Sequence, residues 1–133
     1  MSLHYERECR APAATVWRLY SNPRLWPAWA PHVRRGLGLG DPEVDAGRHG
    51  AVLLLGVIPV PVRVVAKQPD RSWSWELFGI TMRHGVEETS NGSVISLSLH
   101  APRPLELAFA ATYGQLIPLL LGRLAAVAER ASS

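Results

Sequence analysis

The sequence predicts an α+β fold in which one antiparallel β-sheet wraps around a long C-terminal helix. Two observations lead to this prediction. From residue 33 to residue 100 the chain is a succession of short β-prone runs separated by turn residues. After Pro102 and Pro104 the apolar residues recur every three or four positions, which is the period of an amphipathic helix.

The N-terminal part is expected to hold one strand and one short helix. Residues 3–9 alternate between apolar and polar side chains, as a strand does. A helix is expected over residues 15–20, after Pro12, because the first helical turn tolerates proline. It is expected to end at Asn22-Pro23, because the residue before a proline avoids the α region. Residues 25–31 can support only a short helical turn.

Six further strands and the long helix complete the predicted order. The strands are expected over residues 34–40, 50–57, 60–66, 72–78, 81–89 and 93–100, with Pro59 among the turn residues between them. One apolar stripe of the helix comprises Leu105, Phe109, Tyr113, Leu116, Leu120, Leu124 and Val127. Pro118 is expected to bend this helix, because proline lacks the N–H that would bond to the preceding turn and its ring clashes there.

Composition limits the function classes. The 133 residues fit a single domain, 1–133, and a hydrophobic content of 47% against 19% charged residues can form a real core. The first ten residues contain no apolar segment of a secretory signal, and no run is long enough for stable membrane insertion. Cys9 is the only cysteine, which excludes a disulfide within the chain and a multi-cysteine metal site. We therefore expect a cytoplasmic protein, monomer or homodimer, with no metal and no cofactor.

The net charge of +3 does not indicate nucleic-acid binding. Thirteen of the fourteen basic residues are arginines, and they are scattered along the chain, with Arg34-Arg35 as the only adjacent pair. Aromatic residues are not interleaved with them, as a platform for stacking bases requires. A solvated, arginine-rich surface is the simpler interpretation.

Two predicted hairpins assign the faces of the sheet. Asn91-Gly92 is a strong signal for a two-residue turn, and Gly79-Ile80 suits a type II′ turn. Ser90 would then face Ser93, and Leu77 would face Met82. Both turns place the same apolar residues on one inner face: Trp73, Trp75, Leu77, Met82, His84, Val86, Leu97 and Leu99. Glycines 36, 38 and 40 remove side chains from one face of their strand, which favours open space or a close approach of backbone.

At this point the sequence resembles a known family. Ala11-Pro12, Val16-Trp17, Asn22-Pro23 and the segment LWPAWAPHV over residues 25–33 resemble the start of the START-like (SRPBCC, Bet v 1-like) superfamily, in particular its polyketide cyclase/dehydrase branch. The motif GRHG over residues 47–50, the Trp73–Trp75 strand, the hairpin that carries His84 and Glu87, and the terminal helix continue the resemblance. The resemblance implies a helix-grip fold with a deep apolar cavity for lipids, polyketides or other hydrophobic ligands.

The residues expected to line this cavity are the large side chains of the inner face, the tryptophan–proline turn and the helix. They are Trp26, Trp29, His32, Trp73, Trp75, Met82, His84, Leu97, Leu99, Phe109 and Tyr113. Among them His84 and Tyr113 are the catalytic candidates, because a desolvated, neutral histidine can hold a substrate carbonyl or move a proton. The simpler interpretation of His84 is a core histidine held by one hydrogen bond, for instance to Tyr113. Arg7 and Glu88 are further polar residues expected near the rim of the inner face.

Three functions stay open. The first is a binding or transfer protein for a lipid- or polyketide-like molecule, which needs only an apolar cavity with a few polar groups. The second is a polyketide cyclase/dehydratase-like enzyme in which His84 and Tyr113 act on the ligand. The third is an interaction domain, which would show an exposed apolar patch rather than an internal void. No pair of titratable groups is clearly poised for acid–base chemistry, which favours the first.

Overall fold

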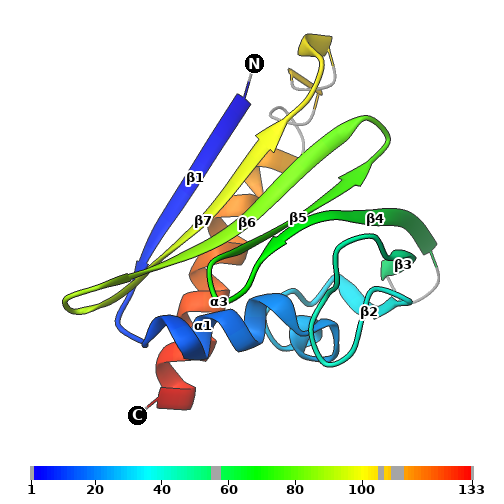
Figure 1. The fold of residues 1–133 in the computed structure, drawn as a ribbon. Coiled ribbons are helices and arrows are strands. Elements are labelled where there is room, and N and C mark those ends of the chain that lie inside the picture. The colour runs from blue at the N-terminus through cyan, green and yellow to red at the C-terminus, as the bar shows by residue number, and fades with distance from the viewer. Residues whose placement is uncertain (1, 55–57, 105–106, 109–112, 133) are drawn as a thin grey trace.

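A computed structural model describes residues 2–54, 58–104, 107–108 and 113–132, and it has the predicted α+β, helix-grip architecture (Figure 1). Seven antiparallel strands form one sheet in the order β1-β7-β6-β5-β4-β3-β2. Their bounds are β1 Ser2–Cys9, β2 Val33–Leu37, β3 His49–Leu54, β4 Ile58–Gln68, β5 Ser72–Leu77, β6 Ile80–Thr89 and β7 Gly92–His100. The first two strands of the chain thus form opposite edges of the sheet.

The connection between these two edges is helical. Helix α1 (Ala13–Ser21) contains the predicted residues 15–20 and ends just before Asn22-Pro23, as the proline predicts. The 3₁₀ helix η1 (Pro23–Ala28) begins at once, and the Asn22 side chain caps it by accepting a hydrogen bond of 3.0 Å from the backbone N–H of Arg24. The two helices cross one end of the sheet (Figure 1).

The C-terminal helix begins later than predicted. Helix α3 (Ile117–Ser132) follows a short 3₁₀ turn, η2 (Tyr113–Gln115), and it packs behind β1 and β7 (Figure 1). Pro118 is its second residue, so the predicted bend at Pro118 is wrong. Proline fits there because the first N–H groups of a helix have no partner within the helix. Of the predicted stripe, Leu120 and Leu124 are buried, whereas Leu105 and Phe109 lie outside the described residues.

The β5–β6 hairpin turns at Phe78-Gly79 rather than at Gly79-Ile80. Leu77 pairs with Ile80, Trp75 with Met82 and Trp73 with His84, so every pair is shifted by two residues from the prediction. Both turn residues have positive φ, +50° for Phe78 and +80° for Gly79, as a type I′ turn requires. This turn matches the twist of the strands better than an unprimed one does.

The β6–β7 hairpin shows the same kind of shift. Its turn is Ser90-Asn91, so Thr89 pairs with Gly92 and Glu88 with Ser93. Gly92 is needed in the strand itself, because its φ is +149° and a Cβ there would collide with the carbonyl oxygen of Cys9. A shift of two residues leaves each side chain on its own face of the sheet, so the predicted inner face is correct although the registers are not.

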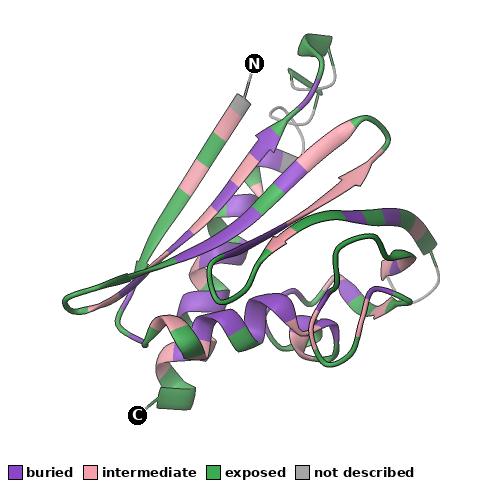
Figure 2. Ribbon diagram, in the orientation of Figure 1, coloured by how far each residue is buried: buried purple, intermediate pink, exposed green. Residues whose placement is uncertain are grey.

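The inner face and the helices share one core. Burial alternates along the central strands, and the buried side of α3 faces them (Figure 2). The buried residues of α3 are Ile117, Leu120, Leu121, Leu124, Ala125 and Ala128. Gly36 leaves no open space, because a Cβ there would lie 3.0 Å from the Trp26 ring. Pro59 lies within β4 rather than in a turn, in a part of the strand that pairs with β3 only.

Candidate functional site

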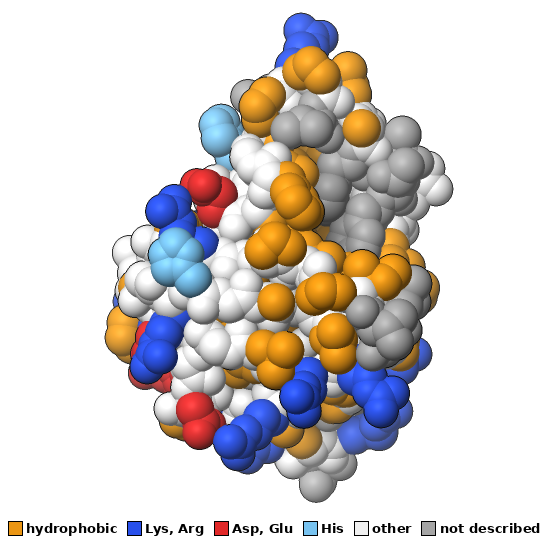
Figure 3. All heavy atoms as spheres, turned by 90° about the vertical axis from the view of Figure 1, so that its right-hand side faces the viewer, with side chains coloured by type: hydrophobic (Ala, Val, Ile, Leu, Met, Phe, Trp, Pro, Cys, Tyr) orange, Lys and Arg blue, Asp and Glu red, His pale blue; other side chains and the backbone are white. Residues whose placement is uncertain are grey.

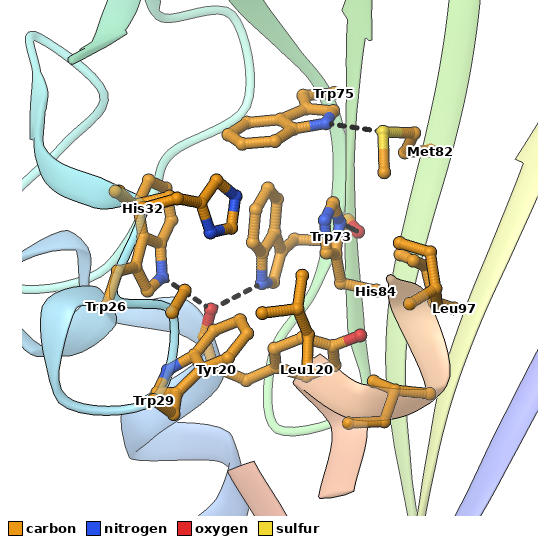
Figure 4. A pocket seen from close by; sticks show the side chains of 14 residues that line it. Tyr20, Trp26, Trp29, His32, Trp73, Trp75, Met82, His84, Leu97 and Leu120 are labelled. Carbon is orange, nitrogen blue, oxygen red and sulfur yellow. Dashed lines mark hydrogen bonds between the residues drawn. The ribbon is translucent and has the colours of Figure 1, made fainter. Parts of the chain in front are cut away.

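A small apolar cavity lies between the inner face of the sheet, η1 and the first turns of α3 (Figure 4). Its volume is about 70 Å³. Fourteen residues line it: Tyr20, Trp26, Trp29, Ala30, His32, Val33, Trp73, Trp75, Met82, His84, Leu97, Ile117, Leu120 and Leu121. Four of the five tryptophans of the chain are among them.

The sheet supplies one wall through its period of two. Trp73 and Trp75 are two residues apart on β5 and therefore point to the same face. Their cross-strand partners on β6 are His84 and Met82, and Leu97 of β7 lies opposite His84. Cross-strand neighbours of this kind have Cβ atoms about 5 Å apart, which brings the five side chains into one patch.

Hydrogen bonds to the end of α1 connect the sheet wall with the opposite wall. The indole N–H of Trp26 donates to the backbone carbonyl of Tyr20 at 2.9 Å, and the indole N–H of Trp73 donates to the same oxygen at 3.2 Å (Figure 4). The indole N–H of Trp29 donates to the carbonyl of Leu19 at 3.0 Å. Carbonyls in the last turn of a helix lack partners within the helix, so these donors satisfy them. These three indole groups are thereby engaged with the backbone.

Trp75 is held differently. It is half-buried, whereas Trp26, Trp29 and Trp73 are buried. Its indole N–H donates to the sulfur of Met82 at 3.3 Å, and a thioether is a weak acceptor. His32 is the other half-buried aromatic residue of the cavity, and its partial burial lowers the pKa of its imidazole. These two side chains therefore mark the side on which the cavity approaches solvent.

His84 lies in the middle of the aromatic wall. Its ring stacks on Trp73 with centroids 3.7 Å apart and planes 8° apart, and it meets the rings of Tyr20 and Trp75 edge-on. Its Nδ1 lies 3.3 Å from the carbonyl oxygen of Trp73. Because a carbonyl only accepts, Nδ1 carries the hydrogen, and Nε2 is then the acceptor of the neutral ring.

The electrostatics keep the two polar rings of the wall neutral. Burial lowers the pKa of His84 to about 3, and the hydrogen bond to Trp73 opposes this shift only in part. Burial likewise raises the pKa of Tyr20 well above its ordinary value, and its hydroxyl donates to the carbonyl of Ser96 at 2.8 Å. A base with so low a pKa holds almost no proton near neutral pH, so His84 is poorly suited to general acid–base catalysis.

The structure brings eight of the eleven predicted ligand-binding residues to the cavity. They are Trp26, Trp29, His32, Trp73, Trp75, Met82, His84 and Leu97. Leu99 is on the predicted face and fully buried, but it does not line the cavity. Phe109 lies outside the described residues, and of Tyr113 only the backbone, in η2, is described.

The two predicted rim residues lie away from the cavity. Glu88 pairs with Ser93 rather than lying beside Ile95, because the hairpin register is shifted, and its side chain is exposed. Arg7 is exposed as well, and it does turn toward α3, because a Cβ on Gly122 would lie 3.5 Å from its Nη1.

Six cavity residues were not predicted from the sequence: Tyr20, Ala30, Val33, Ile117, Leu120 and Leu121. Tyr20 is four residues after Val16 on α1, and this spacing predicts a shared buried face but not which cavity that face meets. Among the residues that the structure describes, no group of three or more His, Cys, Asp or Glu side chains is arranged to hold a metal ion. None of their helices has the length and hydropathy of a transmembrane span.

Comparison with known proteins agrees with this fold. The family model described as polyketide cyclase / dehydrase and lipid transport matches residues 1–129. A protein of Staphylococcus saprophyticus superposes with a TM-score of 0.80 at 10% identity, over 100% of this chain and 95% of its own. A protein of Mesorhizobium loti gives 0.75 at 17% identity, over 98% of both chains.

A third similar structure is norcoclaurine synthase of Thalictrum flavum, in complex with dopamine and hydroxybenzaldehyde. Its TM-score is 0.70 at 15% identity, over 100% of this chain and 88% of its own. No curated protein matches the sequence. At these identities the structural likenesses show the fold alone.

Proposed function

Since the chain belongs to the polyketide cyclase / dehydrase and lipid transport family, we propose that it binds a hydrophobic small molecule, lipid- or polyketide-like, in the cavity between the sheet and α3. The observation that carries this proposal is the chemistry of the cavity wall. Its tryptophan N–H groups and the Tyr20 hydroxyl are engaged within the protein, and burial lowers the pKa of both of its histidines, His32 and His84. Such a wall selects a ligand by shape and apolar contact rather than by charge.

The volume of the cavity limits which ligands can bind without a movement of its walls. A cavity of about 150 Å³ in another protein holds benzene. The cavity here, about 70 Å³, has about half that volume. A lipid- or polyketide-like ligand can therefore enter only if one wall of the cavity moves. Trp75 is the side chain best placed to do so, because it is half-buried and its N–H bonds only to a thioether. The ligand complex of norcoclaurine synthase supports the idea that this fold accommodates small aromatic molecules.

The competing proposal is a cyclase/dehydratase-like enzyme that uses His84 and Tyr113. The low pKa of His84 argues against proton transfer by its imidazole. What remains for His84 in that role is a hydrogen bond to the ligand through Nε2. Binding therefore has more support than catalysis.

The test is a series of neutral aromatic probes of increasing size: benzene, naphthalene and anthracene, each titrated and followed by calorimetry or probe fluorescence. The wild type should bind the smallest probe best, and Trp75→Ala should shift the preference toward larger probes, because it removes the movable wall. Val65→Thr, a change at an exposed position of β4, should leave the preference unchanged.

Two outcomes would overturn the proposal. If neither the wild type nor Trp75→Ala binds any probe, the aromatic side chains form a solid core. If native mass spectrometry of the purified protein shows a bound compound, and His84→Phe accumulates a related, unprocessed one, the enzyme is favoured instead.

A further inference from the structure

One end of the molecule exposes large apolar side chains that the cavity does not use. The exposed fractions are 69% for Phe78, 61% for Leu119, 59% for Leu107 and 49% for Ile58. Figure 3 shows hydrophobic side chains gathered as a band on this face of the molecule. We refer to these four residues as the apolar tip.

The strand registers place Ile58, Phe78 and the start of the segment that leads to Leu107 at the same end of the sheet. Arg63 of β4 pairs with Glu76 of β5, so the start of β4, with Ile58, and the end of β5, next to Phe78, extend in the same direction. Thr81 of β6 pairs with the last residue of β7, so the segment that leads to Leu107 also begins there. Leu119 lies in the first turn of α3, beside the cavity residue Leu120.

The backbone of Phe78 makes its exposure unusual. A type I′ turn favours asparagine or glycine at its first position, because φ is positive there, and a bulky side chain is strained in that conformation. Here a phenylalanine occupies the position with φ +50° and turns most of its surface to solvent. A residue that opposes both local conformational preference and solvation indicates a function outside the fold.

Among the residues that the structure describes near the apolar tip, the charged side chains are mostly positive. Arg34 and Arg35 on β2 lie two strands from Ile58, because β2 pairs with Leu53 and Leu54 of β3, and these residues pair with the start of β4. Arg103 is exposed just after the end of β7. Among the described residues next to the tip, the carboxylate of Glu76 is paired with Arg63 at 3.4 Å. In Figure 3 basic side chains lie above, below and to the left of the hydrophobic band, and the acidic ones lie among the basic ones to its left.

We propose that the apolar tip docks on the surface of a membrane that contains anionic lipid, with Phe78 inserted among the acyl chains and the arginines at the headgroups. Apolar insertion combined with attraction to anionic headgroups is the pattern of reversible, interfacial binding. A second copy of the chain fits this surface less well, because a two-fold interface places a patch against itself and would bring like charges together. The surface goes beyond the proposed ligand binding and does not depend on what the cavity holds.

The test is co-sedimentation of the protein with phosphatidylcholine vesicles, with and without phosphatidylglycerol. The wild type should bind the anionic vesicles, more weakly at high salt. Phe78→Asn should weaken this binding about ten-fold, since it removes a large apolar group from the bilayer. Arg34→Gln with Arg35→Gln should weaken binding to anionic vesicles by about 25-fold, since each arginine contributes about five-fold.

The controls separate docking from folding and from ligand binding. Asparagine tolerates positive φ, so Phe78→Asn should melt at the wild-type temperature or above it and should bind the aromatic probes unchanged. Val65→Thr should bind vesicles as the wild type does. The proposal is overturned if the wild type does not sediment with anionic vesicles, or if Phe78→Asn binds them equally well. It is also overturned if sedimentation velocity shows a wild-type dimer that Phe78→Asn abolishes.

Discussion

The buried histidine makes the stability of the protein dependent on pH in a direction that can be tested. Burial lowers the pKa of His84 from 6.5 to about 3 in the folded state, whereas the unfolded chain keeps the ordinary value. Between these two values the unfolded state binds a proton that the folded state does not. Stability is therefore fully present above pH 6.5 and falls as the solution is acidified.

The expected loss is roughly 1 kcal/mol for each pH unit well below pH 6.5, or roughly 2 kcal/mol between about pH 6.5 and about pH 4.5. The variant His84→Phe keeps an aromatic ring against Trp73 but cannot take up a proton. The free energy of unfolding, measured by urea titration of both proteins, should thus fall more steeply with acid in the wild type. The difference between the two proteins isolates His84, because every other ionisable group is present in both.

His100→Gln is the matched control, because His100 is exposed at the end of β7. This variant should follow the wild-type curve. If the free-energy difference between the wild type and His84→Phe is the same at every pH, the imidazole titrates equally in both states. The argument from desolvation would then be refuted.

Three substitutions test the packing around the site. Gly36→Ala should lower the melting temperature, because its Cβ would lie 3.0 Å from the Trp26 ring. Overpacking of this kind costs about 1–3 kcal/mol. An unchanged melting temperature would mean that the Trp26 ring shifts without cost. Tyr20→Phe should cost about 1 kcal/mol in urea unfolding, since it removes the 2.8 Å hydrogen bond to the Ser96 carbonyl; a stabilised variant would contradict that bond. Leu124→Ala should cost about 2–5 kcal/mol, because Leu124 is fully buried, and a loss below 1 kcal/mol would show that the core collapses around the gap.

The sheet could be predicted from the sequence in its faces but not in its registers. Alternation determines which residues share a side, so Trp73, Trp75 and His84 fall together whichever turn is chosen. The choice of turn was wrong at both hairpins. Gly92 has positive φ, but it serves the close approach of the β1 backbone rather than the turn, and Phe78 occupies a turn position that its side chain disfavours. Neither constraint can be recognised in the strand's own pattern.

In the candidate site, the residues on strands could likewise be predicted from the sequence better than those on helices. The residues contributed by β5, β6 and β7 follow from the period of two, and those of the tryptophan–proline turn from their size. Tyr20 and Leu120 come from helices, and their place depends on how each helix rotates against the sheet. Pro118 lies in the first turn of α3 rather than inside a longer helix, so the start of α3 could not be derived from the stripe, although Leu120 and Leu124 of the stripe are buried as predicted.

The carbonyl oxygen of Tyr20 accepts hydrogen bonds from the indole N–H groups of both Trp26 and Trp73. This one oxygen atom therefore links α1 to η1 and to β5. Helix α1, η1 and β5 cannot separate without breaking the same pair of bonds. In amide hydrogen exchange these segments should therefore open as one cooperative unit, with similar opening free energies.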